Sequence, residues 1–293
     1  MNRSKIVGAT ALASVMAAGA AHAEMSISGL TVGNISDAGG GQSQGFSTNS
    51  IYVSYSDSLD NGMGVSLTMS VNGTQTATNI VTDVNIDTGM GVIGLGIGQD
   101  SAVDAMDGSP ACFSLNACGS ALNANYNDGD AVSGNSIAYS NSVGGIDFKI
   151  TRGMEDATNK PVMSYAAGMS LMGATVKAGV SSVDYINPAT ADVDPSFVTV
   201  GYSIAGLNLG YAVYDSDNGG EETQMGVGTS VAGMNAGVTF ASADKTTDVD
   251  YMRVSLSKGM GAASFGLDYT ETDVSGTDTG DTDVWNFMYV VGF

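Results

Sequence analysis

Five aspartates lie in one long polar stretch, residues 99–133, that contains no lysine or arginine. They are Asp100, Asp104, Asp107, Asp128 and Asp130. Carboxylates with no neighbouring base attract cations, but loop carboxylates are also often no more than solvated surface charges. Both interpretations remain open from the residues alone. The chemistry that this stretch offers is electrostatic.

Catalytic chemistry has little support in this chain, because its one histidine, His22, lies near the N-terminus. Arg3 and Lys5 precede an apolar run over residues 6–21, and Ala21-His22-Ala23 has the small-x-small pattern of a signal-peptidase site. Residues 1–23 are therefore expected to be a secretory signal peptide, leaving a mature domain over residues 24–293. A membrane anchor is the alternative, but the run is short and alanine-rich.

A mature chain without histidine excludes serine–histidine hydrolysis. The sequence also lacks the glycine-rich motifs that bind nucleotide phosphates. We therefore expect a protein that is not an enzyme and has no cofactor.

The two cysteines, Cys112 and Cys118, both fall within the acidic stretch. They are too few for a thiolate zinc site without histidines. In an exported protein they are expected to form a disulfide, and the alternative is a pair of inert buried thiols.

The charge balance limits the partners of the chain. Nine lysines and arginines face thirty acids, and Arg3 and Lys5 belong to the signal, which leaves seven bases. So acidic a protein is expected not to bind nucleic acid. The hydrophobic fraction of 43% argues against disorder. With 41 glycines and four prolines, the composition favours strands and turns.

The elements that would position these residues are strands with period-two alternation. The clearest spans 63–71, where Val65, Leu67 and Met69 alternate with hydroxyl side chains. In the first strand the apolar parity changes, which predicts a bulge at Gly29. The sixteen predicted strands are 25–34, 50–57, 63–71, 80–87, 91–98, 134–141, 145–152, 162–169, 172–180, 196–204, 207–214, 222–230, 234–241, 249–257, 261–269 and 283–293.

Connections between these strands alternate strictly between short and long. Seven are tight, most of them with glycine, as in Asp60-Asn61-Gly62 and Ala205-Gly206. The others are longer and polar, the first over 35–49 and the longest over 99–133. An up-and-down transmembrane barrel with short turns at one end and long loops at the other predicts this order.

The last strand supports the same architecture. One of its faces carries Trp285, Phe287, Tyr289, Val291 and Phe293, with nothing polar among them. A free aromatic edge of this kind invites aggregation in a soluble protein. In a closed outer-membrane barrel it pairs with the first strand and faces lipid.

With an even strand number, a terminal phenylalanine and the longest loop after strand five, the mature chain resembles the Gram-negative general porins. It is most similar to the sixteen-stranded, acidic porins of alphaproteobacteria. The resemblance implies a homotrimer in the cell outer membrane, in contact with lipid and lipopolysaccharide. It also implies a passive, water-filled channel for small hydrophilic solutes and ions. The loop after strand five would fold inward, so that some of its five aspartates line the constriction.

One feature departs from that family. General porins oppose the acidic loop with clustered bases on early strands, whereas no lysine or arginine occurs from Glu24 to Phe148. Strand parity instead places seven charged residues on the lumen wall. These are Asp83, Asp87, Asp147, Lys149, Lys177, Arg253 and Asp268. The charge balance predicts a cation-selective channel.

Acid clusters in the outer loops leave a metal site open. They are Asp192/Asp194, Asp215/Asp217/Glu221/Glu222 and Glu271/Asp273/Asp278/Asp281/Asp283. Such spacing could gather oxygens around Ca²⁺, but repulsive surface acids are the plainer interpretation. The alternative function keeps the barrel as a structural or surface-recognition element whose channel is blocked by its longest loop.

Overall fold

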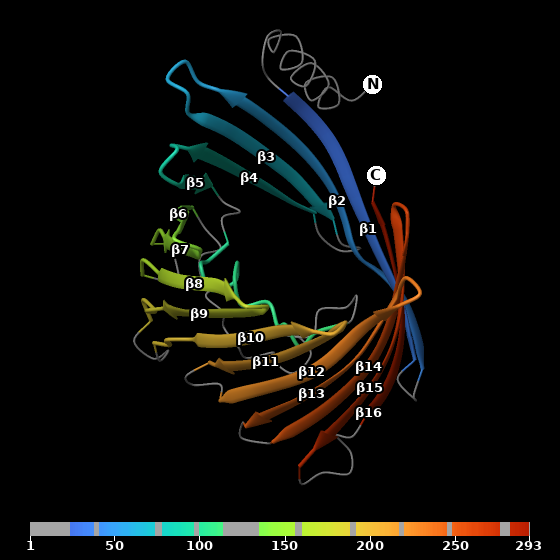
Figure 1. Cartoon of the computed structure of the whole chain (residues 1–293). Coiled ribbons are helices and arrows are strands. Elements are labelled where there is room, and N and C mark those ends of the chain that lie inside the picture. The colour runs from blue at the N-terminus through green and yellow to red at the C-terminus, as the bar shows by residue number, and fades with distance from the viewer. Residues whose placement is uncertain are drawn as a thin grey trace.

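The computed structural model describes residues 24–37, 41–73, 78–96, 100–113, 135–155, 160–187, 192–216, 220–244, 248–275 and 282–292. Over these residues, sixteen antiparallel strands form one closed barrel (Figure 1). The strands are β1 (Glu24–Asp37), β2 (Gln42–Ser58), β3 (Gly64–Gly73), β4 (Thr78–Asp87), β5 (Val92–Gly96), β6 (Ser136–Val143), β7 (Ile146–Gly153), β8 (Met163–Leu171), β9 (Ala174–Ser182), β10 (Ser196–Ile204), β11 (Leu207–Asp215), β12 (Glu221–Val231), β13 (Met234–Asp244), β14 (Val249–Met260), β15 (Ala263–Val274) and β16 (Thr282–Gly292). The predicted all-β, up-and-down architecture is confirmed.

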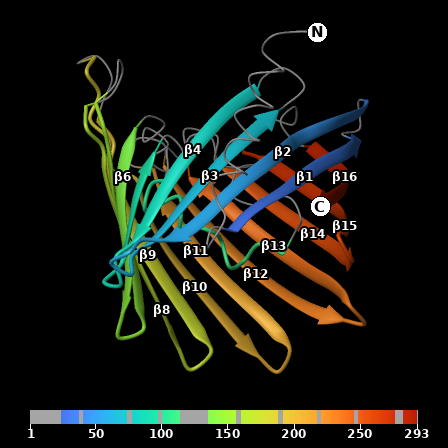
Figure 2. The same cartoon turned by 90° about the horizontal axis from the view of Figure 1, so that it is seen from above.

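Closure of the barrel comes from pairing between its first and last strands. Strands β1 and β16 pair from Leu30 with Gly292 to Asp37 with Trp285, and Figure 2 shows the blue and red strands side by side. Because every strand then has two neighbours, the barrel has no open edge. In the part of the chain that is described, no helix is long and apolar enough to cross a membrane.

The tight turns at one end of the barrel depend on left-handed backbone. Ala205 and Gly206 have φ angles of 51° and 81°, and Ala232 and Gly233 have angles of 52° and 75°. Two successive positive φ angles are those of a type I′ turn, whose twist matches the flanking strands. Hairpins of this kind fix the register of β10–β11 and β12–β13.

The two faces of the sheet differ as the alternation predicts. The outer face is apolar and aromatic: Tyr269 and Trp285 contact each other at 4.9 Å between ring centroids, and Phe265 stacks on Phe287 at 6.3 Å. The inner face carries small and polar side chains. Phe293 lies outside the described residues.

Two details of the first hairpin differ from the prediction. Strand β2 begins at Gln42, so that the first loop spans 38–41 and not 35–49. The added strand is polar, so alternation gave no sign of it, yet its pairing with β1 satisfies its backbone. The bulge predicted at Gly29 is also wrong, because the shift lies between Val32 and Gly33. Leu30 and Val32 therefore lie on the inner face, where apolar residues were not expected.

Candidate functional site: the inward segment and the channel wall

Residues 100–113, which follow β5, lie inside the barrel against its wall. Figure 1 shows this segment as a teal trace within the ring of strands. Four wall strands form hydrogen bonds with its backbone. At its start, Thr151 Oγ1 donates to Asp100 O at 3.2 Å, and Val103 N donates to Ser164 Oγ at 3.0 Å. Further along, the Tyr214 hydroxyl donates to Asp107 O at 2.7 Å, and Thr239 Oγ1 donates to Ala111 O at 2.6 Å. The segment thus follows the wall from β7 to β13.

A short coiled turn begins the inward segment. Ala105 N donates to Ser101 O at 3.1 Å, and Asp107 N donates to Val103 O at 2.8 Å. Ala102 and Val103 are fully buried in a cluster with wall residues that include Phe197. Burial of these small apolar side chains favours docking of the turn against β8, β10 and β11.

Lys149 and three acids form an interacting set of charges at one side of the segment, which we call the Lys149 group. Lys149, a residue of β7, interacts electrostatically with Asp100 and Asp104 of the segment and with Asp83 of β4. The tertiary structure therefore brings together four charges that the sequence assigned separately to a loop and to a wall. Three negative charges around one positive charge leave this part of the lumen with excess negative charge.

Of the three other predicted loop acids, the structure describes one. Asp107 is half-buried beside Tyr214, with which it interacts electrostatically. Asp128 and Asp130 lie outside the described residues. Asp107 therefore faces a different region of the wall from Asp100 and Asp104.

The other predicted wall residues are spread over the barrel. Asp87 ends β4, where its Oδ1 accepts from Gly89 N at 2.9 Å in the turn. Asp147 is exposed near the start of β7. Lys177 lies on the inner face of β9, opposite Thr199 of β10, which is 2% exposed. No described contact joins Asp87, Asp147 or Lys177 to the Lys149 group.

Arg253 and Asp268 belong to a second, buried group on β12–β15. Each is 2% exposed. The Arg253 guanidinium carbon lies 5.1 Å from the centre of the Tyr251 ring, and its Nε donates to Thr270 Oγ1 at 3.2 Å. Stacking on an aromatic face and a hydrogen bond both stabilise a buried guanidinium.

The prediction that Glu222 belongs to an outer-loop acid cluster is wrong. The sequence grouped it with outer-loop acids, but it lies in β12, is 3% exposed and accepts from Gln224 Nε2 at 2.6 Å. It alternates on the inner face with Gln224, and Tyr251 interacts electrostatically with it. The alternation 222, 224, 226 was visible in the sequence, but the adjacent acids suggested a loop.

The chain matches a known family over nearly its whole length. A sequence model described as Gram-negative porin matches residues 8–291. The chain belongs to the Gram-negative porins. It is thus an outer-membrane porin channel, in agreement with its closed barrel of sixteen described strands.

Solved structures share the fold of this porin at low sequence identity. A loop L8 deletion mutant of OmpT, an outer membrane protein of Vibrio cholerae, has a TM-score of 0.74 at 12% identity, covering 93% of this chain and 100% of that one. A mutant of Rh. blastica porin has a TM-score of 0.73 at 13% identity, covering 92% and 100%. The in-vitro folded, trimer form of Vibrio cholerae OmpT has a TM-score of 0.72 at 13% identity, covering 93% and 100%. No curated protein matches this chain in sequence.

The wall on the early strands of the porin is rich in hydroxyl groups and carries no base. Thr68 of β3 pairs with Asp83 on one side and with Ser54 of β2 on the other, so these residues share the inner face. Their neighbours on that face are Ser50, Tyr52, Ser56, Ser66 and Ser70. The acidic segment is therefore not opposed by basic residues on β2 and β3.

Cys112 lies near the end of the described segment and is disulfide-bonded. Cys118 is the one other cysteine of the sequence, and it lies outside the described residues. A small ring in the inward loop therefore remains the predicted arrangement.

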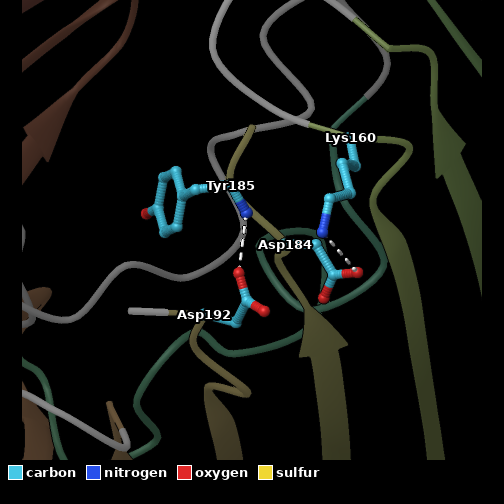
Figure 3. Close-up of polar contacts among 4 residues, drawn as sticks. All are labelled: Lys160, Asp184, Tyr185 and Asp192. Atoms are coloured by element: carbon cyan, nitrogen blue, oxygen red, sulfur yellow. Dashed lines mark hydrogen bonds and ion pairs between the residues drawn. The ribbon is translucent and has the colours of Figure 1, made fainter. Parts of the chain in front are cut away.

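The outer loops after β7 and β9 pack on each other (Figure 3). Lys160 Nζ lies 3.8 Å from Asp184 Oδ2, and Tyr185 N donates to Asp192 Oδ1 at 2.9 Å. Val162 and Val183 are fully buried beneath them. Asp192, predicted as part of a calcium cluster, thus has a structural contact with the backbone. Within the described ranges, no group of three or more His, Cys, Asp or Glu side chains is arranged for a metal ion. Calcium at the outer loops stays a prediction.

Sequence reasoning missed the wall residues that hold the segment. Thr151, Ser164, Tyr214 and Thr239 looked like ordinary polar positions on inner faces. The feature that these four residues share is a hydroxyl group on the inner face, and most strands of this porin have such a group. This feature was therefore too common to single them out.

Proposed function

We propose that this porin is a passive, cation-selective diffusion channel for small hydrophilic solutes and ions. The observation that carries the proposal is the acidic inward segment, held against one side of the wall by hydrogen bonds from β7, β8, β11 and β13. Because the segment lies against one side, we expect an open passage between it and the opposite wall. No chemical step is needed, since the segment acts on solutes through the width of the passage that it leaves and through its negative charge.

Cation preference follows from the charges near the segment. Asp83, Asp100 and Asp104 outnumber Lys149, and the hydroxyl-rich wall on β2 and β3 adds no positive charge. Salt screens charges beyond about 8 Å at physiological ionic strength, so only groups beside the passage affect the ions. The preference for cations should therefore decrease as the salt concentration rises.

Conductance and reversal potential in a planar bilayer test this function. We expect ion-conducting steps and, in a KCl gradient, a reversal potential of the sign that indicates K⁺ preference. A folded barrel that never conducts would instead support the structural or surface-recognition role. Anion preference would mean that Lys149, Lys177 or Arg253 controls the narrow region.

We further propose a homotrimer that uses the outer face of β1–β5. Among the described side chains on that face, Tyr55 is the one aromatic, whereas Ile27, Ile51, Leu67 and Met69 are exposed aliphatics. Aromatic residues favour the lipid–water interface, and a face covered by another subunit does not need them. The trimer form of Vibrio cholerae OmpT, which shares the fold, supports this stoichiometry.

A further inference from the structure

The inward segment ends on a floor of glycines. Pro110, Ala111 and Phe113 lie over five glycines of the inner face, which we call the glycine floor: Gly201 of β10, Gly210 of β11, Gly226 and Gly228 of β12, and Gly237 of β13. Glycine weakens a strand, so five glycines at one place in a sheet call for a local cause.

Two of these glycines contact the backbone of the segment. A Cβ atom at Gly210 would lie 2.2 Å from Ala111 N and 2.2 Å from Pro110 C. A Cβ atom at Gly226 would lie 2.3 Å from Ala111 O. Neither contact is possible for real atoms, and backbone atoms cannot rotate away as a side chain does. Any side chain at either position would therefore displace the segment towards the lumen.

Phe113 covers the other part of the floor. A Cβ atom at Gly228 would lie 2.3 Å from its Cδ1, and one at Gly237 would lie 2.4 Å from its Cβ. Gly228 and Gly237 are direct cross-strand partners, so they form one flat site beneath the phenylalanine.

The register shows that the floor forms a line across the strands. Gly201 pairs with Gly210, Gly210 pairs with Gly226, and Gly226 pairs with Thr239. Thr239 is the residue whose hydroxyl donates to Ala111 O at 2.6 Å. Three glycines thus remove side chains where the segment crosses, and the next residue in the line fixes the segment by a hydrogen bond.

We propose that the glycine floor sets the size limit of the channel, because it determines how far the inward segment stands from the wall. This inference rests on the proposed channel function. Gly210 and Gly226 are positioning residues: they act on solutes only through the segment that they let approach the wall.

Substitution to alanine tests the proposal by solute exclusion. In planar bilayers we expect Gly210→Ala and Gly226→Ala to lower the single-channel conductance and to exclude polyethylene glycols that the parent channel admits. Gly64→Ala is the matched control, since its Cβ would make an ordinary 3.4 Å contact with Asp87 on the inner face, and should behave as the parent. Folded Gly210→Ala and Gly226→Ala barrels with the parent size limit would overturn the proposal.

A double substitution covers the case in which those variants fail to fold. Gly228→Ala meets the Phe113 ring, so it should also lower the size limit, and Phe113→Ala in the same chain should restore it. If Gly228→Ala alone has no effect, or if removal of the ring restores nothing, the floor does not set the limit.

A thiol reporter separates this inference from the channel function. Thr239 is 1% exposed beneath Ala111, so a Thr239→Cys thiol should react slowly with a membrane-impermeant maleimide. Adding Gly226→Ala should raise its rate of labelling, whereas adding Gly64→Ala should not. Equal rates in all three chains would contradict displacement of the segment, whether or not the protein conducts.

Discussion

Lys149 has three charged neighbours in the lumen, since Asp83, Asp100 and Asp104 all act on it. Its positive charge offsets part of their field, so removal of that charge should strengthen the preference for cations. We predict that Lys149→Gln raises the K⁺/Cl⁻ permeability ratio by at most about fivefold, the equivalent of roughly 1 kcal/mol for one partly solvated charge.

Lys258→Gln is a suitable control for that experiment, because this exposed residue of β14 pairs with Phe265 on the outer face. Its reversal potential in a KCl gradient should match that of the parent. An unchanged ratio in Lys149→Gln would show that the group of four charges lies away from the narrowest point.

Removal of the negative charges of Asp104 and Asp107 should have the opposite effect to removal of the Lys149 charge. Replacing both by asparagine keeps the shape of the side chains and removes two negative charges, so the permeability ratio should fall. Asp283→Asn removes an exposed charge from β16, where Asp283 pairs with Glu271 two residues along the strands from the outer aromatic pair Tyr269–Trp285. If Asp283→Asn lowers the ratio as much as the double variant, selectivity comes from the general surface charge and not from the segment.

At the scale of the element, the inward segment combines buried apolar side chains with hydrogen bonds to the wall. The predicted Cys112–Cys118 disulfide would close a small ring directly after its most closely packed part. The loop-entropy relation gives such a ring roughly 2 kcal/mol of stabilisation, which is small for a whole barrel.

We therefore expect Cys112→Ser/Cys118→Ser to unfold at nearly the parent temperature but to show noisier channel currents. Intact mass under non-reducing conditions should show no free thiol in the parent protein. Two titratable thiols, or identical current noise in the parent and the variant, would contradict the local role of the ring.

At the scale of the whole molecule, the distribution of aromatics distinguishes two sides of the barrel. Strands β15 and β16 carry Phe265, Tyr269, Trp285 and Phe287 on the outer face, whereas that face of β1–β5 is mainly aliphatic. We predict a trimer in detergent that migrates as a heat-sensitive oligomer and has a circular dichroism spectrum dominated by β structure.

Ile51→Trp should weaken that trimer, since a larger side chain at a subunit contact prevents close approach. Leu256→Trp places the same side chain on the outer face of β14, where lipid would accommodate it. Size-exclusion chromatography with light scattering should show monomers for Ile51→Trp alone. Equal trimer stability in the two variants would place the contact on other strands.

Local alternation was sufficient to predict the architecture. The period of two residues in each strand is a property of neighbouring side chains, and tight turns such as Ala205-Gly206 depend on a few residues. Strand existence, strand order and the inner face for Lys149, Lys177, Arg253 and Asp268 were therefore accessible from sequence. The polar start of β2 was not, because pairing with β1 and not alternation makes it a strand.

Only the tertiary structure decided how the inward segment lies. Its contacts join residues far apart in the chain: Thr239 and Ala111 are separated by 128 positions, and Tyr214 and Asp107 by 107. Such pairs depend on closure of the barrel, which brings β11–β13 beside a loop that leaves β5. The sequence shows where the charges and glycines are, but their meeting at one wall follows from the curvature of the whole sheet.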